Sequence, residues 1–218
     1  MFVVKEKPKS IGAEAYKILR TNIQYSSFDK DIKVIMITSS QPEEGKSTIA
    51  GNLALSMAQD GKKTMLIDCD LRKPTIHKKF NISNSSGLSE IIVGKAKLLT
   101  SMVEVDNNLT IITSGKTPPN PSEMLGSKNI QTLIEELREH YDCIIIDTPP
   151  ILAVTDAQII SRNTDGIVLV VRAGCTKKDN AIKAKKQIEN VGGKIIGTVF
   201  NDVKRKHSKD KYYYYGEK

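Results

Sequence analysis

One short polar stretch, residues 39–48, constrains the fold of this chain more than any other part of it. Its sequence is Ser-Ser-Gln-Pro-Glu-Glu-Gly-Lys-Ser-Thr, with an apolar, β-branched run before it (residues 32–38) and a helix-prone run after it (residues 49–58). Strand, tight loop and helix in this order allow backbone N–H groups and a helix N-terminus to converge on phosphate oxygens. The stretch therefore predicts a phosphate-binding loop.

The end of this loop matches the Walker A motif G-x-x-x-x-G-K-[ST] in part. Gly45, Lys46 and Ser47 fit the last three positions, whereas Ser40 stands where the first glycine belongs. In such a loop Lys46 reaches the β- and γ-phosphates, and the Ser47 hydroxyl holds Mg²⁺. The alternative is an ordinary helix N-terminus capped by Ser or Thr, so other signals must decide between the two interpretations.

Two further apolar runs end in carboxylates. Residues 63–67 lead directly into Asp68 and Asp70, and three consecutive isoleucines lead into Asp147. The carboxyl ends of parallel strands meet at the edge of the sheet where ligands bind. Asp68 and Asp70 there suit Mg²⁺ ligation or proton abstraction, and Asp147 has the Walker B form that holds Mg²⁺. The alternative is a pair of polar turns that close core strands.

Strands and helices alternate along the chain, which predicts an α/β fold with a single doubly wound, mostly parallel sheet. We expect strands over residues 33–38, 63–67, 109–113, 141–147, 164–171 and 194–200. We expect helices over residues 12–23, 47–60, 87–94, 122–140 (capped by Ser122 and broken near Gly126) and 177–191.

The chain divides into three parts by pattern. Residues 1–30 are expected to form an N-terminal arm, extended over residues 1–11, followed by an oligomerisation helix. Residues 31–201 form the P-loop domain, and residues 202–218 a flexible basic tail with a tyrosine cluster. In the first helix Glu14, Lys17 and Arg20 recur every third residue, either as a solvated face with local ion pairs or as an interface stripe. Another face of that helix carries Ala15, Ile18, Leu19 and Asn22.

The composition indicates a cytosolic protein with an acidic partner. The net charge of +8 favours a nucleotide, a nucleic acid or an anionic membrane surface, although lysine-rich faces that only keep the protein in solution explain it as well. Without tryptophan there is no base-stacking platform, so no nucleic acid is expected. No apolar run is long enough for a membrane span and no signal peptide is present. The three scattered cysteines are expected to be reduced thiols.

Four consecutive tyrosines, Tyr212, Tyr213, Tyr214 and Tyr215, lie near the end of the chain. No amphipathic pattern explains them, because alternate rings would face opposite sides of any strand. They are either an exposed, adhesive terminus or a modifiable site, where each phosphate would add about −1.5 to −2 charge.

Together, the three motifs and the terminal tyrosines resemble the bacterial tyrosine kinases (BY-kinases) of the capsular or exopolysaccharide type, in the Gram-positive form with a separate cytoplasmic catalytic chain. The resemblance covers nearly the whole chain and implies a P-loop fold of the Walker A/A′/B type that uses ATP and Mg²⁺. It implies that Lys46 contacts the phosphates, Thr48 supports the α-phosphate, and Ser47 and Asp147 organise Mg²⁺. It also implies nucleotide contacts around Ser40, Glu44 and Gly45, with Arg172 and Asn201 lining the site.

The resemblance extends to the reaction. Asp68 would accept the proton of the attacking tyrosine hydroxyl, and Asp70 would hold the water shell of the metal. Tyr212–Tyr215 would be phosphorylated in trans by a neighbouring subunit. Transfer of this kind depends mainly on positioning and on charge neutralisation at the γ-phosphate.

The resemblance also implies partners. The family carries a Glu-x-x-Arg-x-x-Arg motif that helps close an octameric ring, and this chain has Glu14, Lys17 and Arg20 at those positions. Lys17 departs from the motif and lacks the planar bidentate fork of arginine. Other implied partners are a membrane-spanning adaptor whose cytoplasmic tail recruits the kinase to the inner face of the membrane, a cognate tyrosine phosphatase and further protein substrates.

Two rival classes stay open. A Min/Par-type partitioning ATPase shares the sheet and the Walker motifs, but its signature lysine after the first loop glycine is replaced here by Gln41. A non-catalytic, nucleotide-sensing scaffold is expected to lose its carboxylates, yet Asp68, Asp70 and Asp147 are all present. A eukaryotic-type kinase is excluded, because its Gly-rich hairpin, His-Arg-Asp loop and Asp-Phe-Gly motif are absent.

Overall fold

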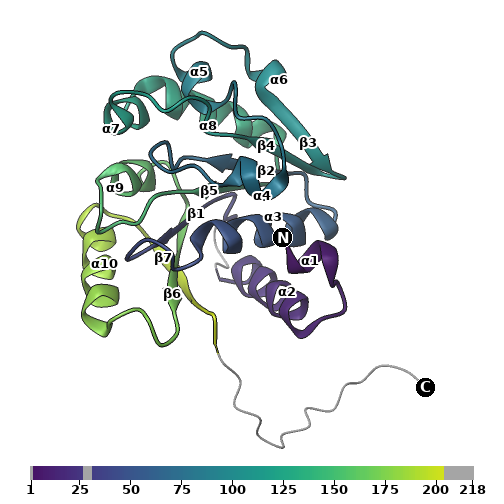
Figure 1. Cartoon of the computed structure of the whole chain (residues 1–218), viewed down its shortest axis with the longest axis vertical. Helices are drawn as coiled ribbons and strands as arrows, with labels where there is room; N and C mark the ends of the chain where they lie inside the picture. The colour runs from purple at the N-terminus through teal and green to yellow at the C-terminus, as the bar shows by residue number, and fades with distance from the viewer. Residues whose placement is uncertain (1, 27–30, 204–218) are drawn as a thin grey trace, which may run out of the picture.

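A computed structural model describes residues 2–26 and 31–203 as a three-layer α/β fold, with helices on both faces of one twisted sheet (Figure 1). The seven strands of this sheet follow the order β3-β4-β2-β5-β1-β6-β7. Their bounds are β1 Val34–Ser39, β2 Thr64–Asp68, β3 Met102–Asp106, β4 Leu109–Ile112, β5 Cys143–Asp147, β6 Gly166–Arg172 and β7 Ile195–Asn201.

The sheet is parallel except at one edge. Strands β1, β2, β4, β5, β6 and β7 pair in parallel, while β3 pairs antiparallel with β4. The chain winds outward from β1 in both directions, so the prediction of a doubly wound, mostly parallel sheet is confirmed. The edge strand β3 was not predicted from the sequence, because its residues are half-buried or exposed and do not form a continuous apolar run.

The core consists of two apolar layers, one on each face of the sheet. Alternate residues of a strand point to opposite faces, so Val34 and Met36 of β1 join one layer while Ile35 and Ile37 join the other. All four are fully buried, as expected for a central parallel strand covered by helices on both sides. The helices that supply the two layers hold the loops at the carboxyl edge of the sheet in place.

The helices fall into two groups. One layer is completed by α1 Val3–Glu6, α2 Ile11–Gln24, α3 Lys46–Gln59 and α4 Ile76–Phe80. The other is completed by α5 Leu88–Ile92, α6 Leu98–Ser101, α7 Pro121–Leu125, α8 Lys128–His140, α9 Asp156–Ser161 and α10 Lys178–Asn190. No helix within the described ranges is both long and apolar enough to span a membrane.

The prediction of an extended arm over residues 1–11 is wrong. Residues 3–6 form the short helix α1, and Phe2 and Val4 are buried. The Phe2 ring packs against Phe80, with ring centroids 4.3 Å apart, and covers Gly51 so closely that a Cβ atom there would lie 2.2 Å from the ring. The segment is therefore part of the core, although four residues are too few to show helical periodicity.

One further detail differs from the predictions. Helix α7 begins at Pro121 after Asn120, so Ser122 lies inside the helix and is not its cap. Its hydroxyl instead donates to the buried carboxylate of Asp156, at 2.6 Å. The expected break near Gly126 is confirmed, since α7 ends at Leu125 and α8 starts at Lys128. Of the predicted tail, all but Asp202 and Val203 lies outside the described residues.

Candidate active site

The loop between β1 and α3 has the shape of a phosphate-binding loop. Gly45 directly precedes α3 with φ +95°, a left-handed conformation that favours glycine. A Cβ atom at this position would lie 2.1 Å from Nδ2 of Asn201. That amide in turn donates to the carbonyl of Glu44, at 3.0 Å. Glycine is thus required here both for its backbone conformation and for the close approach of β7.

A buried polar pair holds the loop together in the absence of its first glycine. The Ser40 hydroxyl donates to the Glu44 carboxylate at 2.8 Å, and the backbone N–H of Gln41 donates to the same carboxylate at 3.0 Å. The hydroxyl of Thr176, after β6, is a third donor to it. Ser40 and Glu44 are nearly inaccessible to solvent, so their side chains shape the loop, and their contact with a nucleotide stays a prediction.

The carboxylates of the other two motifs meet beside this loop. Strands β2 and β5 pair in a register that places Asp68 next to Asp147. Asp70 follows two residues later, and the Cys69 side chain between the two aspartates is buried in the core. Nζ of Lys46 lies 3.0 Å from Oδ2 of Asp70. The structure thus brings together Lys46, Asp68, Asp70 and Asp147, as the sequence predicted for a common site.

Asp68 is held in one orientation by the backbone. One of its oxygens accepts from the N–H of Asp70 at 3.1 Å, and the other accepts from the N–H of Ile76 at 3.1 Å. Burial raises the pKa of Asp68 well above its ordinary value, and the charge of the neighbouring Asp147 adds to this effect. Asp68 therefore combines a fixed carboxylate with an increased affinity for a proton.

Asp147 and Lys46 influence each other electrostatically. Burial raises the pKa of Asp147 from 3.8 to about 6, while the ammonium of Lys46 works in the opposite direction. Burial alone would lower the pKa of Lys46, but the charges of Asp147 and Asp70 outweigh it and raise that pKa. Lys46 therefore stays protonated and can neutralise an anion.

The donor groups fit Mg²⁺. Both oxygens of Asp147 are buried and accept no hydrogen bond from any described residue, an arrangement that is unfavourable without a cation or water. Mg²⁺ at nucleotide sites needs only one or two carboxylates, because phosphates and waters complete its octahedron. Within residues 2–26 and 31–203, no cluster of three or more His, Cys, Asp or Glu side chains is placed to hold a metal. Asp147, Asp70 and Ser47 are thus suitable ligands.

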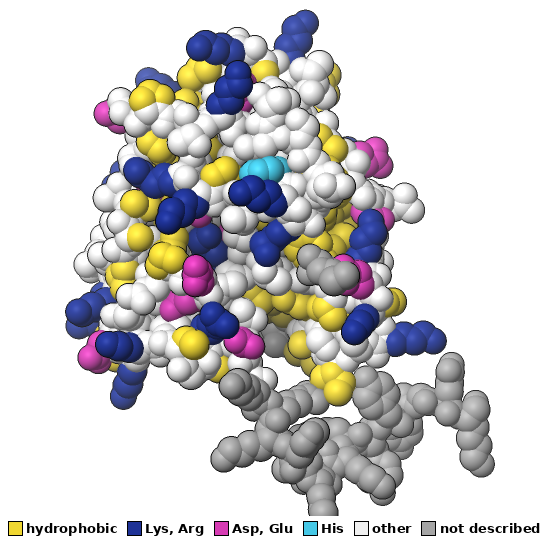
Figure 2. Space-filling view, in the orientation of Figure 1, with side chains coloured by type: hydrophobic (Ala, Val, Ile, Leu, Met, Phe, Trp, Pro, Cys, Tyr) yellow, Lys and Arg dark blue, Asp and Glu magenta, His cyan; other side chains and the backbone are white. Residues whose placement is uncertain are grey.

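A cavity of about 580 Å³ lies in front of these groups, between the loop, α4 and residues 150–154. Figure 2 shows Lys and Arg side chains gathered over the central part of this face of the molecule. Three basic residues line the cavity: Arg72, which the sequence places with Asp68 and Asp70 after a strand, and Lys73 and Lys79, which sequence reasoning had not assigned to the site. The position of Lys79 gave no signal in the sequence, because α4, the helix that carries it, was not predicted.

A larger cavity of about 840 Å³ lies elsewhere, between α10 and β7. Its lining includes the apolar side chains of Val171, Ile182 and Phe200, and none of the residues of the three motifs. The chemistry of the site therefore assigns a phosphate ligand to the smaller cavity.

Arg172 and Asn201, the two residues expected to line the nucleotide site, do lie next to the loop. Arg172 forms an ion pair with Asp202, with Nη2 and Oδ2 2.9 Å apart, and its Nη1 donates to the carbonyl of Glu43 at 3.4 Å. Their direct contact with a nucleotide stays a prediction.

The three residues of the expected interface stripe on α2 do not share one environment. Glu14 and Lys17 are exposed and form an ion pair with each other, with 3.1 Å between Nζ and Oε2. Arg20 faces α3 instead, where it donates to the carbonyl of Ser56 at 2.8 Å and pairs with Asp60 at 3.0 Å. The role of all three in assembly stays a prediction.

The buried residues of α2 do not coincide with the group formed by Ala15, Ile18, Leu19 and Asn22. Ala13 and Ile23 are buried, whereas Ala15, Ile18 and Asn22 are exposed. Of the four residues grouped on one face, Leu19 packs against the core.

The order of strand, phosphate loop, helix and two strand-end carboxylates defines a P-loop nucleoside triphosphatase fold with Walker A, A′ and B motifs. Residues 32–193 match the AAA domain family. The chain is 46% identical to the tyrosine-protein kinase YwqD of Bacillus subtilis over 219 residues, which covers 99% of this chain and 91% of the relative. The chain belongs to the bacterial tyrosine kinases.

Two solved structures place this result in context. The chimerical protein CapA2B2 has a TM-score of 0.91 and 41% identity, and the match covers 94% of this chain and 90% of that one. The septum site-determining protein MinD of Pyrococcus horikoshii, solved with Mg-ADP, has a TM-score of 0.66 and 21% identity over 77% of this chain and 69% of that one. The second likeness concerns the fold alone.

Proposed function

We propose that this protein is an ATP-dependent protein-tyrosine kinase that phosphorylates its own tyrosines Tyr212–Tyr215 in trans. The observation that carries the proposal is that Lys46 and Asp70 form an ion pair at the cavity, while the neighbouring strand ends bring the buried carboxylates of Asp68 and Asp147 side by side. Membership of a family whose relatives are named tyrosine-protein kinases supports the choice of tyrosine as the acceptor. The tyrosine cluster itself lies outside the described residues.

In the proposed reaction the tyrosine oxygen attacks the γ-phosphorus, the bond from that phosphorus to the β–γ bridging oxygen breaks, and ADP leaves. The tyrosine proton passes to a carboxylate oxygen of Asp68, whose raised pKa increases its affinity for a proton. Lys46 leaves Asp70 and neutralises charge on the β- and γ-phosphates. Mg²⁺ bound to Ser47, Asp70 and Asp147 would supply further positive charge there.

The proposed biological role is regulation of capsular or exopolysaccharide synthesis from the cytoplasmic face of the membrane. We propose a membrane-spanning adaptor that recruits and activates the kinase, a ring-shaped homo-oligomer (an octamer by the family resemblance), a cognate tyrosine phosphatase and further protein substrates. CapA2B2 is a chimerical protein, and its likeness to this chain supports a partner fused or docked to the same fold.

The test is phosphotyrosine mapping by mass spectrometry after incubation of the full chain with ATP·Mg²⁺ and an adaptor tail. The label is expected on Tyr212–Tyr215 and should disappear in Lys46→Met, because the phosphates lose their main cation. Label on Ser or Thr, or label that survives Lys46→Met, contradicts the proposal.

The same experiment separates the two alternatives. Slow ATP hydrolysis without phosphotyrosine favours the Min/Par-type ATPase, whose fold this chain shares. Nucleotide binding without turnover of any kind favours a nucleotide-sensing scaffold.

A further inference from the structure

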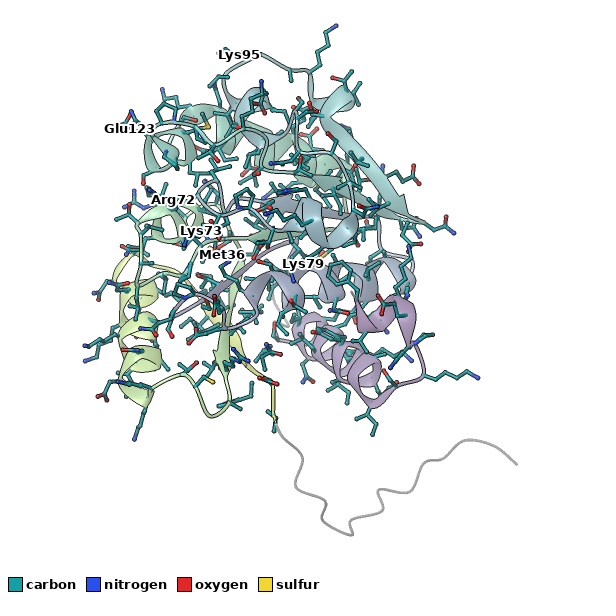
Figure 3. All side chains as sticks on the ribbon, in the orientation of Figure 1. Met36, Arg72, Lys73, Lys79, Lys95 and Glu123 are labelled. Atoms are coloured by element: carbon teal, nitrogen blue, oxygen red, sulfur yellow. The ribbon has the colours of Figure 1, made fainter. Side chains whose placement is uncertain are left out.

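Lys79 on α4 reaches across to the first turn of α3. Its Nζ donates to Oγ1 of Thr48 at 2.9 Å, and both residues line the cavity of the site. Figure 3 shows Lys79 between α4 and α3, with Arg72 and Lys73 nearer to α9. The ammonium of Lys79 therefore lies next to the phosphate loop although it is 31 residues away from Thr48 along the chain.

The element that carries Lys79 is well anchored. The N–H groups of Thr75 and Ile76 donate to Asp68, at 3.3 and 3.1 Å, and the Ile76 side chain is fully buried. The ring of Phe80 packs on Phe2, with centroids 4.3 Å apart. These contacts hold α4 from both of its ends, so Lys79 is presented to the cavity by a fixed backbone.

The charge of Lys79 is available to a ligand. Of the other cations that line the cavity, Lys46 pairs with Asp70, Arg72 pairs with Asp156, and Lys73 is exposed. Among the described residues, no carboxylate lies within 4.0 Å of the Lys79 ammonium. A partly buried ammonium that is bonded only to a neutral hydroxyl gains more from an anionic ligand than from water.

The position of Thr48 indicates which phosphate is concerned. Lys46 starts α3 and extends toward Asp70, where the β- and γ-phosphates are proposed to lie. Thr48 lies two residues further into the helix, and the family resemblance implies that it supports the α-phosphate. We propose that Lys79 is a second phosphate-binding cation of this site, which contacts the α-phosphate together with Thr48. The inference rests on the proposed nucleotide site and is independent of the acceptor of the phosphoryl group.

The test compares three variants of the full chain by calorimetric titration with ADP·Mg²⁺ and ATP·Mg²⁺. Lys79→Met should raise Kd for both nucleotides by about tenfold or more, because a charge-assisted contact is lost. Lys79→Gln keeps a donor for Thr48 but lacks the charge, and it should show a similar loss. Lys78→Met removes the exposed neighbouring lysine of the same helix and should bind as the wild type does.

Four results would overturn the inference. If Lys79→Gln binds nucleotide with wild-type affinity, the charge of Lys79 does not contribute to binding. If Lys78→Met loses as much affinity as Lys79→Met, the effect comes from the general surface charge and not from Lys79. If Lys79→Met loses affinity for ATP but not for ADP, Lys79 contacts the γ-phosphate and not the α-phosphate. A Lys79-dependent affinity in a protein that forms no phosphotyrosine would support the inference while contradicting the kinase proposal. A wild-type chain that binds neither nucleotide overturns both.

Discussion

The ammonium of Lys46 and the carboxylate of Asp70 lie 3.0 Å apart across the carboxyl edge of the sheet, with 12% and 5% of their side chains exposed. The pair links the phosphate loop to the end of β2 through two groups with proposed roles at the nucleotide site, Lys46 on the phosphates and Asp70 on Mg²⁺. Lys46 cannot remain on Asp70 and bind phosphate at full strength, because an ammonium shared between two anions binds each of them more weakly. The ion pair therefore competes with the ligand when Mg²⁺ is absent.

The first prediction concerns this competition. Asp70→Asn should tighten binding of ADP in the presence of EDTA, by about three- to tenfold, because Lys46 is released and a like charge is removed. With Mg²⁺ the same variant should lose phosphotyrosine formation, since the metal loses a ligand. Fluorescent-nucleotide titration and phosphotyrosine mapping measure the two effects. Asp179→Asn, an exposed carboxylate on α10, serves as the control, and weaker binding by Asp70→Asn in EDTA would contradict the competition.

The second prediction concerns pH. Because the pKa of Asp147 is raised from 3.8 to about 6, the folded protein binds a proton more readily than the unfolded chain does. Ionised Asp147 therefore destabilises the nucleotide-free fold. The destabilisation is absent below about pH 4, grows as pH rises toward 6, and approaches about 3 kcal/mol above that value.

Replacement by a neutral amide removes this dependence. The free energy of unfolding of Asp147→Asn, minus that of the wild type, should increase between pH 4.5 and pH 7.5 in urea titrations. A difference that stays constant, or decreases, over this range would show that the carboxylate is not destabilised by burial.

The third prediction separates backbone strain from steric contact in the loop. Gly45 and Gly61 have φ values of +95° and +82°, but a Cβ atom at Gly45 meets Asn201 at 2.1 Å, whereas at Gly61 it meets nothing within 4 Å. Gly61→Ala should cost about 1 kcal/mol of unfolding free energy from strain alone and leave ADP binding intact. Gly45→Ala should cost more and abolish ADP binding. Equal behaviour of the two variants in urea and nucleotide titrations would contradict the steric role of Asn201.

The three motifs could be predicted from the sequence because each is a contiguous run in which strand, turn and chemistry follow one another. Asp68 and Asp147 needed only the rule that parallel strands share their carboxyl edge. Lys79 and Thr176 could not be found in this way, since their contacts with Thr48 and Glu44 depend on where α4 and the segment after β6 are packed. Periodicity likewise placed Arg20 on an outward stripe, because it cannot tell which face of α2 meets α3.

The last prediction concerns assembly through α2. Glu14→Ala with Arg20→Ala should convert an oligomer to monomers on a sizing column, but Arg20 also anchors α2 to Ser56 and Asp60. Glu14→Ala with Lys17→Ala avoids this complication, because these exposed residues pair only with each other among the described salt bridges. If α2 forms the interface, the second double variant should also elute as a smaller species.

The control is an exposed pair of similar geometry on another helix, Lys185 and Glu189 of α10, whose Nζ and Oε1 lie 3.5 Å apart. Their double alanine variant should keep the wild-type elution volume. The Glu14 and Lys17 variant should keep the wild-type unfolding midpoint, because an exposed ion pair contributes about 0–1 kcal/mol. A smaller species with Arg20 replaced, but none with Lys17 replaced, would show that α2 acts through its packing on α3. An oligomer that survives both double variants would remove this stripe from the interface.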